Sequence, residues 1–269
     1  ISTKNGDSIE VLHQLDSVSV LFLDPARRNS SGGKVVSMTD CEPNVLELCD
    51  EMVKKSCFTI IKLSPMLDWH SAVAQLKYVT EVHIVSVGNE CKELLLVLTD
   101  RNKTAKGCKS NTIQIFCVND NDVFSYEEDF YSEVENIPQQ RIFDRNATLP
   151  PYLYEPNASI MKAGCFAQLS ETYGIAALGH NSHLFVSPDF LPHFPGRKFQ
   201  IVNVCTLNKK ELRRALAGMA QANIAVRNFP MRVDELKKRL KLRDGGEHYI
   251  FATTRGDKEH ILIISKKEV

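Results

Sequence analysis

The chain has 269 residues, a hydrophobic content of 43% and a formal net charge of zero, with 33 basic and 33 acidic side chains. This length can bury one large core or two modest ones, so we expect two domains. No apolar run approaches the roughly 18 residues that a membrane span needs, and the first residues lack the features of a signal peptide. The sequence therefore argues against a membrane-spanning or secreted protein.

The zero net charge conceals an uneven distribution along the chain. From Arg197 to the last residue there are 17 lysines and arginines and 8 aspartates and glutamates, so this segment has a formal charge of +9 and the rest −9. A basic segment of this kind is the expected surface for a polyanion. A solvated basic face with no partner is the alternative.

The cysteine and histidine patterns point to no special chemistry. The eight cysteines include no CxxC pair and mostly lie in apolar stretches, which predicts reduced core thiols in a cytoplasmic protein. His180, His183 and His193 share a loop, but their spacing fits no ligand motif. We therefore predict no metal site.

The first predicted elements are a capped helix and a buried strand. Gly6, Asp7 and Ser8 predict a turn with an N-capping residue, followed by one short amphipathic helix. Residues 18–23 form a nearly continuous apolar run, which is typical of a strand covered on both faces within a parallel sheet.

The residues that follow this strand are the first candidates for a site. Asp24 and Pro25 come at its carboxyl end, where ligands of open α/β sheets bind. Arg27 and Arg28 then place two permanent cations beside a carboxylate, an arrangement that suits phosphate or nucleotide contact. A solvated turn at a strand end is the alternative.

The same pattern of strand, polar-proline end and helix occurs a second time. A helix is predicted from residues 40–43 onward, and a second buried strand over 58–63 ends in Ser64 and Pro65. Further strands are predicted over 81–87, 93–99 and 112–118, the first two joined as a hairpin. Residues 1–118 therefore predict the second half of a doubly wound α/β sheet.

The remaining chain divides into three predicted parts. Residues 119–151 are acidic and aromatic and predict a linker, and residues 152–198 predict a helical connector with a helix that ends at Gly174. Residues 199–269 follow a β-α-β-α-β-β order, which suits a small α+β domain. Its basic residues, among them Arg227 and Lys241 near element ends, are expected to contact a phosphate backbone.

Several motifs resemble one known family. The chain resembles the class I S-adenosylmethionine-dependent methyltransferases that carry a C-terminal THUMP-like domain, on the motifs GDSIEVL, LFLDPARR, DCEPNV, IKLSPMLD, GNECKELLLVL, YLYEPNASIMKAG, FPGRKF, RNFP and LKLRDGGEHYIFATT. The resemblance covers essentially the whole chain. It implies the C-terminal half of a Rossmann-like methyltransferase sheet, then a ferredoxin-like connector and a basic THUMP-like domain, with RNA as the substrate class.

The resemblance also implies roles for individual residues. Asp7 and Ser8 match the positions that contact the adenine of S-adenosylmethionine, and Asp24 and Pro25 match the motif that lines the transferable methyl and the target base. Similar Asp-Pro-Ala-Arg runs occur in RNA uracil-5-methyltransferases, which attack uracil with a cysteine before an Asn-Pro. Here the matching stretch ends in Ser64, so that covalent mechanism does not carry over.

The family's glycine-rich cofactor turn and its ribose-binding acidic residue are not found in these 269 residues. Gly32 and Gly33 follow the wrong strand to replace that turn, and the NSSGGK loop lacks the spacing of a phosphate loop. We therefore expect that the first half of the sheet belongs upstream of Ile1. A natural half-enzyme is the alternative.

The leading prediction is a methyltransferase that acts on a nucleic acid base, most plausibly in RNA. Asp24 and Ser64 are its catalytic candidates together with Pro25, and Lys62 joins the arginines Arg27 and Arg28 in contacting substrate. The alternatives are a noncatalytic RNA-binding module and a small-molecule methyltransferase with a dimerising tail.

Overall fold

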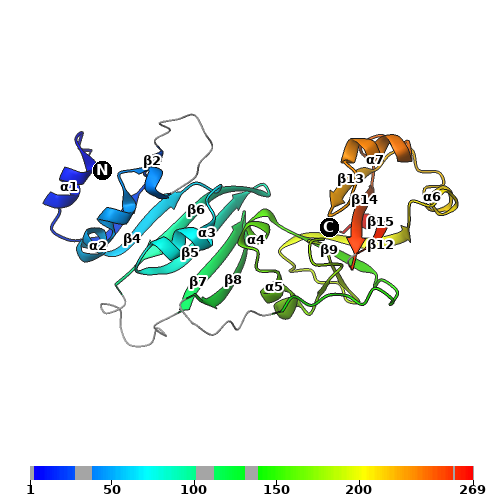
Figure 1. The fold of residues 1–269 in the computed structure, drawn as a ribbon, viewed down its shortest axis with the longest axis horizontal. Coiled ribbons are helices and arrows are strands. Elements are labelled where there is room, and N and C mark those ends of the chain that lie inside the picture. The colour runs from blue at the N-terminus through cyan, green and yellow to red at the C-terminus, as the bar shows by residue number, and fades with distance from the viewer. Residues whose placement is uncertain (1–2, 28–37, 101–111, 131–138, 257, 269) are drawn as a thin grey trace. The chain divides into compact units, whose positions relative to one another are not determined.

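The computed structural model describes residues 3–27, 38–100, 112–130, 139–256 and 258–268. The chain divides into two compact units, Ile1–Glu135 and Asn136–Val269. Figure 1 shows the elements of both units.

The first unit is built on a mixed six-stranded sheet in the order β1-β4-β6-β5-β7-β8. β1 pairs with β4 and β5 with β7 in parallel, and the other neighbours are antiparallel. Its elements are α1 (Ser8–Gln14), β1 (Val18–Leu23), β2 (Ala26–Arg27), η1 (Met38–Asp40), β3 (Cys41–Glu42), α2 (Val45–Lys55), β4 (Ser56–Leu63), α3 (Trp69–Gln75), β5 (Val79–Val87), β6 (Glu90–Leu98), β7 (Thr112–Asn119) and β8 (Asp122–Asp129). The five predicted strands are therefore observed, as β1, β4, β5, β6 and β7. Within the sheet, β6 lies between β4 and β5 and is antiparallel to both.

Side-chain caps set where the helices of this unit begin. Asp7 caps α1 as predicted, because its Oδ1 accepts a 2.7 Å hydrogen bond from the backbone N–H of Ile9. The second helix starts later than the 40–43 stretch suggests, at Val45, because Asn44 accepts from Leu46 N at 3.1 Å. The hydrogen bond from Leu46 N to the Asn44 side chain sets the start of the helix after Pro43, although proline is also favoured in the first turn of a helix.

The predicted linker begins too early, because β8 lies inside it. β7 and β8 form a hairpin whose turn contains Asp120 at a φ of 52°. Phe124 on β8 is buried and Tyr126 and Glu128 are half-buried, whereas the residues between them, Val123, Ser125, Glu127 and Asp129, are exposed. This alternation is the pattern of a half-buried edge strand, and the acidic composition conceals it.

The second unit is built on a seven-stranded sheet in the order β10-β11-β9-β12-β15-β14-β13. Its elements are β9 (Tyr152–Pro156), α4 (Ala158–Ala163), α5 (Phe166–Tyr173), β10 (Ala176–Ala177), β11 (Phe185–Ser187), β12 (Gly196–Cys205), α6 (Lys209–Ala215), β13 (Asn223–Arg227), α7 (Val233–Leu240), β14 (His248–Arg255) and β15 (Glu259–Lys267). β9 pairs with β12, so one sheet runs across the boundary predicted at residue 198.

The helical stretch predicted before Gly174 is two helices. Gly164 ends α4 with a left-handed φ of 73°, and Gly174 ends α5 at 65°, as predicted. Glu155 and Pro156 belong to β9, and the helix begins after Asn157, whose side chain accepts from Ile160 N.

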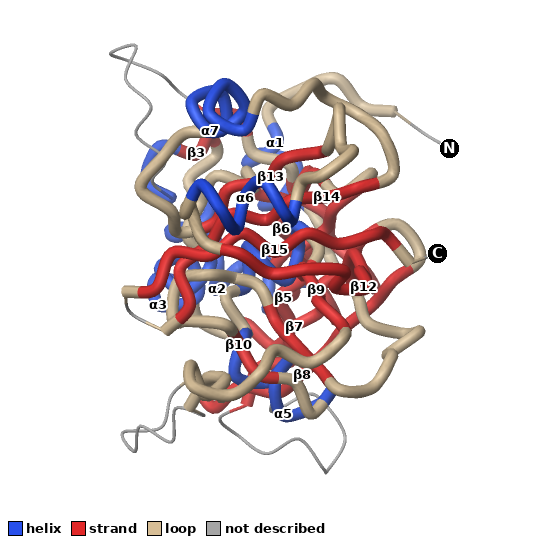
Figure 2. Tube along the Cα trace, turned by 90° about the vertical axis from the view of Figure 1, so that its right-hand side faces the viewer, coloured by secondary structure: helices blue, strands red, loops and turns tan. Residues whose placement is uncertain are grey.

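The helices α6 and α7 cover the same face of the second sheet, as Figures 1 and 2 show. Leu236 and Leu240 of α7 are buried there with residues of β14 and β15, and Leu212 and Leu216 of the α6 segment pack against the same cluster. The opposite face holds a second core around Leu153, Phe199, Phe251 and Ile263.

Within the described residues, no helix combines the length and apolar character needed to cross a bilayer.

Candidate functional site

An ion pair at the carboxyl edge of the first sheet joins two residues that the sequence singles out. β1 and β4 are parallel with Leu23 opposite Ile61, so the next residues, Asp24 and Lys62, emerge side by side. Lys62 Nζ lies 2.5 Å from Asp24 Oδ2, and both side chains remain partly open to solvent. The structure thus brings Asp24 and Lys62 together, because parallel strands end at a common edge.

The electrostatic surroundings keep Lys62 protonated. Its hydrogen bond to Asp24 raises the pKa of Lys62, and the negative charges of Asp24 and Glu93 add to this effect, against a smaller lowering by desolvation. Lys62 is therefore a cation at neutral pH. It can orient a carboxylate or contact a phosphate, but it cannot act as a base.

Glu93 is a charged neighbour of this site that the sequence analysis did not include. It lies on β6, one position before Leu94, which faces Leu63 across the sheet. The antiparallel course of β6 returns its first residues to the edge where β4 ends. The alternating charges of the ECKE run were a weak signal for it.

Ser64 and Pro25 lie beside the ion pair in the chain. Ser64 is buried, and its hydroxyl oxygen accepts a 3.2 Å hydrogen bond from the backbone N–H of Met66. This bond closes a local turn. Pro25 is half-buried, directly after Asp24.

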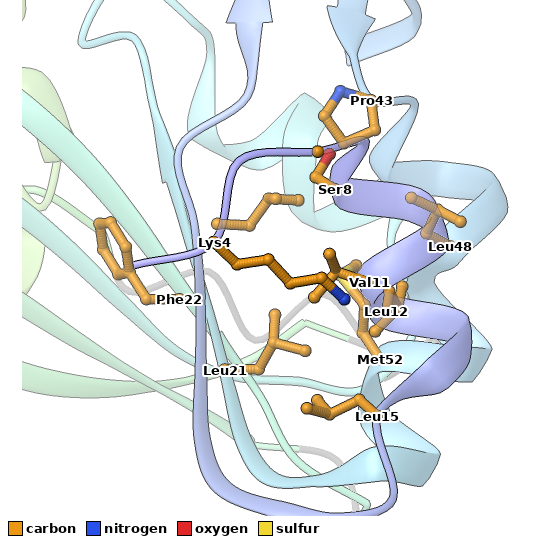
Figure 3. A pocket seen from close by; sticks show the side chains of 12 residues that line it. Lys4, Ser8, Val11, Leu12, Leu15, Leu21, Phe22, Pro43, Leu48 and Met52 are labelled. Atoms are coloured by element: carbon orange, nitrogen blue, oxygen red, sulfur yellow. The ribbon is translucent and has the colours of Figure 1, made fainter. Parts of the chain in front are cut away.

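Asp7 and Ser8 lie at the start of α1, beside an apolar pocket of 320 Å³ (Figure 3). Ser8 lines the pocket, whereas Asp7 makes its observed hydrogen bond to the helix N-terminus. The lining comes from α1, β1, α2 and their flanks and is formed by Lys4, Gly6, Ser8, Val11, Leu12, Leu15, Leu21, Phe22, Leu23, Pro43, Leu48 and Met52. The pocket is thus an apolar slot with one hydroxyl and one ammonium group at its wall.

The expectation that β1 is covered on both faces is wrong for this chain. β1 is the edge strand of the sheet, and Val20 and Phe22 are 53% and 58% exposed. Phe58, opposite Val20 on β4, is 45% exposed. The three side chains form an uncovered apolar patch at an open sheet edge, an arrangement that proteins usually protect.

The predicted substrate-binding residues are dispersed over the chain. Arg27 belongs to β2, which pairs with β3, and its side chain lies outside the described residues, as does all of Arg28. Lys241 is exposed and ends α7 in a left-handed conformation with a φ of 57°. Arg227 forms an ion pair with Glu155 within the second unit.

Glu155 is a buried carboxylate held by two arginines. Its Oε2 accepts from Nε of Arg197 at 2.6 Å and from Nη2 of the same side chain, and its Oε1 accepts from Nη2 of Arg227 at 2.6 Å. A Cβ at position 196 would collide with the carbonyl oxygen of Glu155, so Gly196 permits the close approach of β12 to β9. The arrangement is a charge cluster that links β9, β12 and β13.

Cys49 and Cys205 are buried, and His183 is half-buried. Burial is the main cause that raises the pKa values of Cys49 and Cys205 to about 11, so both thiols are neutral at pH 7. His183 stacks on Phe166 with ring centroids 4.8 Å apart. No group of three or more His, Cys, Asp or Glu side chains in the described part of the chain could hold a metal ion.

We expect thiol-specific alkylation at pH 8 to label Cys57 and to spare Cys49 and Cys205. Cys57 is exposed, whereas a thiol with a pKa of 11 is only about 0.1% ionised at pH 8. Mass spectrometry of the alkylated peptides measures the sites. Labelling in denaturant, where all eight cysteines should react, is the control, and rapid native labelling of Cys49 would contradict the prediction.

Residues 152–195 match a ferredoxin-like domain family, and residues 196–267 match the family described as THUMP domain-like. The chain is also similar to the crystal structure of a putative methyltransferase from Porphyromonas gingivalis W83, with 30% identity and a TM-score of 0.81. The match covers 98% of this chain and 64% of that one, so the chain spans less than two thirds of its relative's length. No curated protein matches the sequence.

The predicted fold class is confirmed. The chain is mixed α/β, its sheets match part of the P. gingivalis structure, and its second unit holds the ferredoxin-like and THUMP-like matches. The two matched families meet at residues 195 and 196.

Proposed function

We propose that the first unit is the substrate-side half of an S-adenosylmethionine-dependent methyltransferase domain, and that the second unit binds the RNA that is methylated. The Asp24–Lys62 ion pair at the carboxyl edge of two adjacent parallel strands carries the proposal. Similarity to the P. gingivalis structure over 98% of this chain supports the methyltransferase class. The THUMP-like match and the +9 charge of the C-terminal segment support RNA as substrate.

In methyl transfer, the main task of the protein is to align the two reactants. S-adenosylmethionine supplies a methyl group that its sulfonium already makes electrophilic, so the protein has to position a nucleophile and accept a proton. The Asp24 carboxylate is the group we assign to that contact. Lys62 restrains the carboxylate through Oδ2 and adds a positive charge for substrate phosphate.

We assign the pocket beside α1 to the adenine end of the cofactor. The pocket beside α1 has a volume of 320 Å³, within the range of small-molecule sites, and its walls are mainly apolar. The Ser8 hydroxyl supplies a polar contact for a purine, and Asp7 precedes it at the helix start. The glycine-rich turn for the methionine end would come from residues upstream of Ile1.

The remaining candidates divide into two groups. Ser64, Pro25, Arg27 and Arg28 adjoin the ion pair in sequence, and we assign them to the target nucleotide. In the second unit Lys241 is exposed and open to an RNA phosphate.

Arg227 is less available than Lys241, because its guanidinium is engaged by Glu155. A direct contact between Arg227 and RNA would have to use the guanidinium nitrogens that do not bind Glu155.

The open edge of β1 provides a test of the missing half-sheet. In a protein extended upstream of Ile1, an added strand and its helices would cover Phe22. Phe22→Thr should then lower the free energy of unfolding of the extended protein by about 3 kcal/mol, the usual cost of deleting a buried phenylalanine side chain. In the 269-residue chain, where Phe22 is 58% exposed, the loss should stay within about 0.5 kcal/mol.

Val123→Thr is the matched control for this substitution. Val123 is 60% exposed on β8, the opposite edge of the same sheet. Urea denaturation of both proteins measures the changes. Equal losses from Phe22→Thr in the short and the extended protein would contradict an added strand at β1.

Methyl transfer tests the proposed function directly. The extended protein should bind S-adenosylmethionine in calorimetry and transfer a labelled methyl group to RNA. Salt-sensitive RNA binding without any uptake of the cofactor would favour a noncatalytic RNA-binding module instead. Methyl transfer with no affinity for RNA would favour a small-molecule substrate. We place the protein in the cytoplasm, where such RNA substrates occur.

A further inference from the structure

The exposed face of α6 carries a concentration of positive charge that the methyltransferase site does not use. Lys209, Lys210, Arg213 and Arg214 are all exposed, and together they line a pocket of 310 Å³. Figure 2 shows α6 on the outside of the second sheet. Among the residues that the structure describes, these four form the lining.

The local structure holds this face in a defined orientation. Asn208 caps the helix, since its side chain accepts a 2.9 Å hydrogen bond from Lys210 N. Leu212 and Leu216 on the other side pack against the core of the second unit. The basic side chains are therefore turned outward by the burial of the apolar ones.

The one acidic residue of α6, Glu211, offsets only part of this charge, since Arg214 alone among the four cations contributes to its lowered pKa, after the hydrogen bonds from Thr206. Glu211 Oε2 accepts hydrogen bonds from the backbone N–H of Thr206 at 2.7 Å and from its hydroxyl at 2.8 Å. These bonds are the main cause of the lowered pKa of Glu211. Its carboxylate is thus directed to the preceding turn.

The spacing of the four cations is also unfavourable for the stability of α6. Lys209 and Arg213 are four residues apart, as are Lys210 and Arg214, and like charges at this spacing repel each other. Within the described residues none of the four forms an ion pair, in contrast to Lys237 on α7, which lies 2.7 Å from Asp244. An anionic ligand would relieve this repulsion.

We propose that the α6 pocket binds consecutive phosphates of an RNA backbone; the identity of the polymer rests on the proposed function. Guanidinium groups match phosphate oxygens in bidentate fashion, and lysines add point charges. The lining has no apolar or aromatic side chain to anchor a protein partner. An acidic protein therefore fits this surface less well than a nucleic acid backbone.

Charge reversal on α6 tests the proposal with the 269-residue chain. The probe is a fluorescein-labelled 20-nucleotide oligouridylate, and fluorescence anisotropy gives the Kd between 50 and 200 mM KCl. Arg213→Glu/Arg214→Glu should raise the Kd about tenfold at the lower salt concentration. It should also reduce the slope of log K against log salt by about 1.4, which corresponds to two phosphate contacts on a single strand.

The variant is expected to fold, because each new glutamate lies four residues after a lysine. Lys258→Glu/Lys267→Glu is the control, since both lysines are exposed and the net charge changes equally. This control should keep a slope close to that of the unmodified chain. Equal losses in the two variants would overturn the α6 site, and so would competition by poly-L-glutamate as effective as competition by unlabelled RNA.

The test separates the site from the proposed function. RNA methylation by the extended protein with unchanged binding by the α6 variant would reject the site and keep the function. RNA binding that depends on α6, in an extended protein that transfers no methyl group, would reject the function and keep the site.

Discussion

Replacing Asp24 with alanine is expected to lower the rate of methyl transfer by the extended protein by about 10²- to 10⁴-fold, the usual contribution of a positioned acid–base group. The carboxylate lies at the carboxyl edge of β1, and Lys62 orients it from the adjacent strand. Single-turnover transfer of a labelled methyl group to RNA measures the effect.

The same substitution should leave the fold nearly unchanged. The Asp24–Lys62 pair is partly exposed, and solvent screens such pairs strongly. The raised pKa of Lys62 means that its stabilising charge is present at all pH values below the ordinary lysine pKa of 10.5 and is lost only at higher pH. Stability near pH 7 should therefore not depend on the titration of Lys62.

Two further variants sharpen this experiment. Asp122→Ala, at the start of β8 on the opposite edge of the sheet, removes an exposed carboxylate and should keep the normal rate. Lys62→Met leaves the Asp24 carboxylate without its partner and should reduce the rate less than Asp24→Ala does. Normal methyl transfer by folded Asp24→Ala protein would remove Asp24 from the site.

Replacing Glu155 with alanine is expected to destabilise the second unit by about 1 to 3 kcal/mol, the usual cost of removing one partner of a buried hydrogen bond, because the two arginines left behind are each 37% exposed and partly screened by solvent. Glu155 is 5% exposed and forms ion pairs with both Arg197 and Arg227. Its loss would leave two guanidinium groups near each other without a counter-charge.

The single tryptophan provides an internal control for this measurement. Trp69 is buried in the first unit, so its fluorescence in urea reports that unit, and hydrogen exchange at β9 and β12 reports the second. The exposed Glu171→Ala on α5 should change stability by no more than about 0.5 kcal/mol.

A triple replacement distinguishes lost charge pairing from lost packing. Glu155→Leu/Arg197→Met/Arg227→Met replaces the whole cluster by apolar groups and should recover much of the stability. A loss below about 1 kcal/mol for Glu155→Ala alone would show that the cluster contributes little.

The strand ends near Asp24 and Lys62 could be predicted, because local patterns define where a strand stops. Apolar runs followed by Asp24-Pro25 and Ser64-Pro65 mark two strands that stop at similar points, and parallel pairing brings such ends together. The Asp24–Lys62 contact follows from this register. Glu93 could not be foreseen, because it reaches the edge through the antiparallel return of β6.

The sequence alone did not show which strands pair with each other, or which strand faces are covered by other elements. Residues 122–129 look like an acidic linker until β7 supplies a partner for them. Val20 and Phe22 look buried, yet β1 is an edge strand in this chain. Both errors have one cause, since composition does not reveal which neighbour a strand has.

By itself, the sequence determined the order of most strands and helices, the helix start at Asp7, the helix end at Gly174 and the basic character of the C-terminal segment. These features depend on side chains acting on their own stretch of backbone. Only the tertiary structure decided that Glu155 meets Arg197 and Arg227, and that four cations of α6 line one pocket. Such sites depend on which side chains remain outside once the apolar faces are buried, and this is settled only when distant segments pack together.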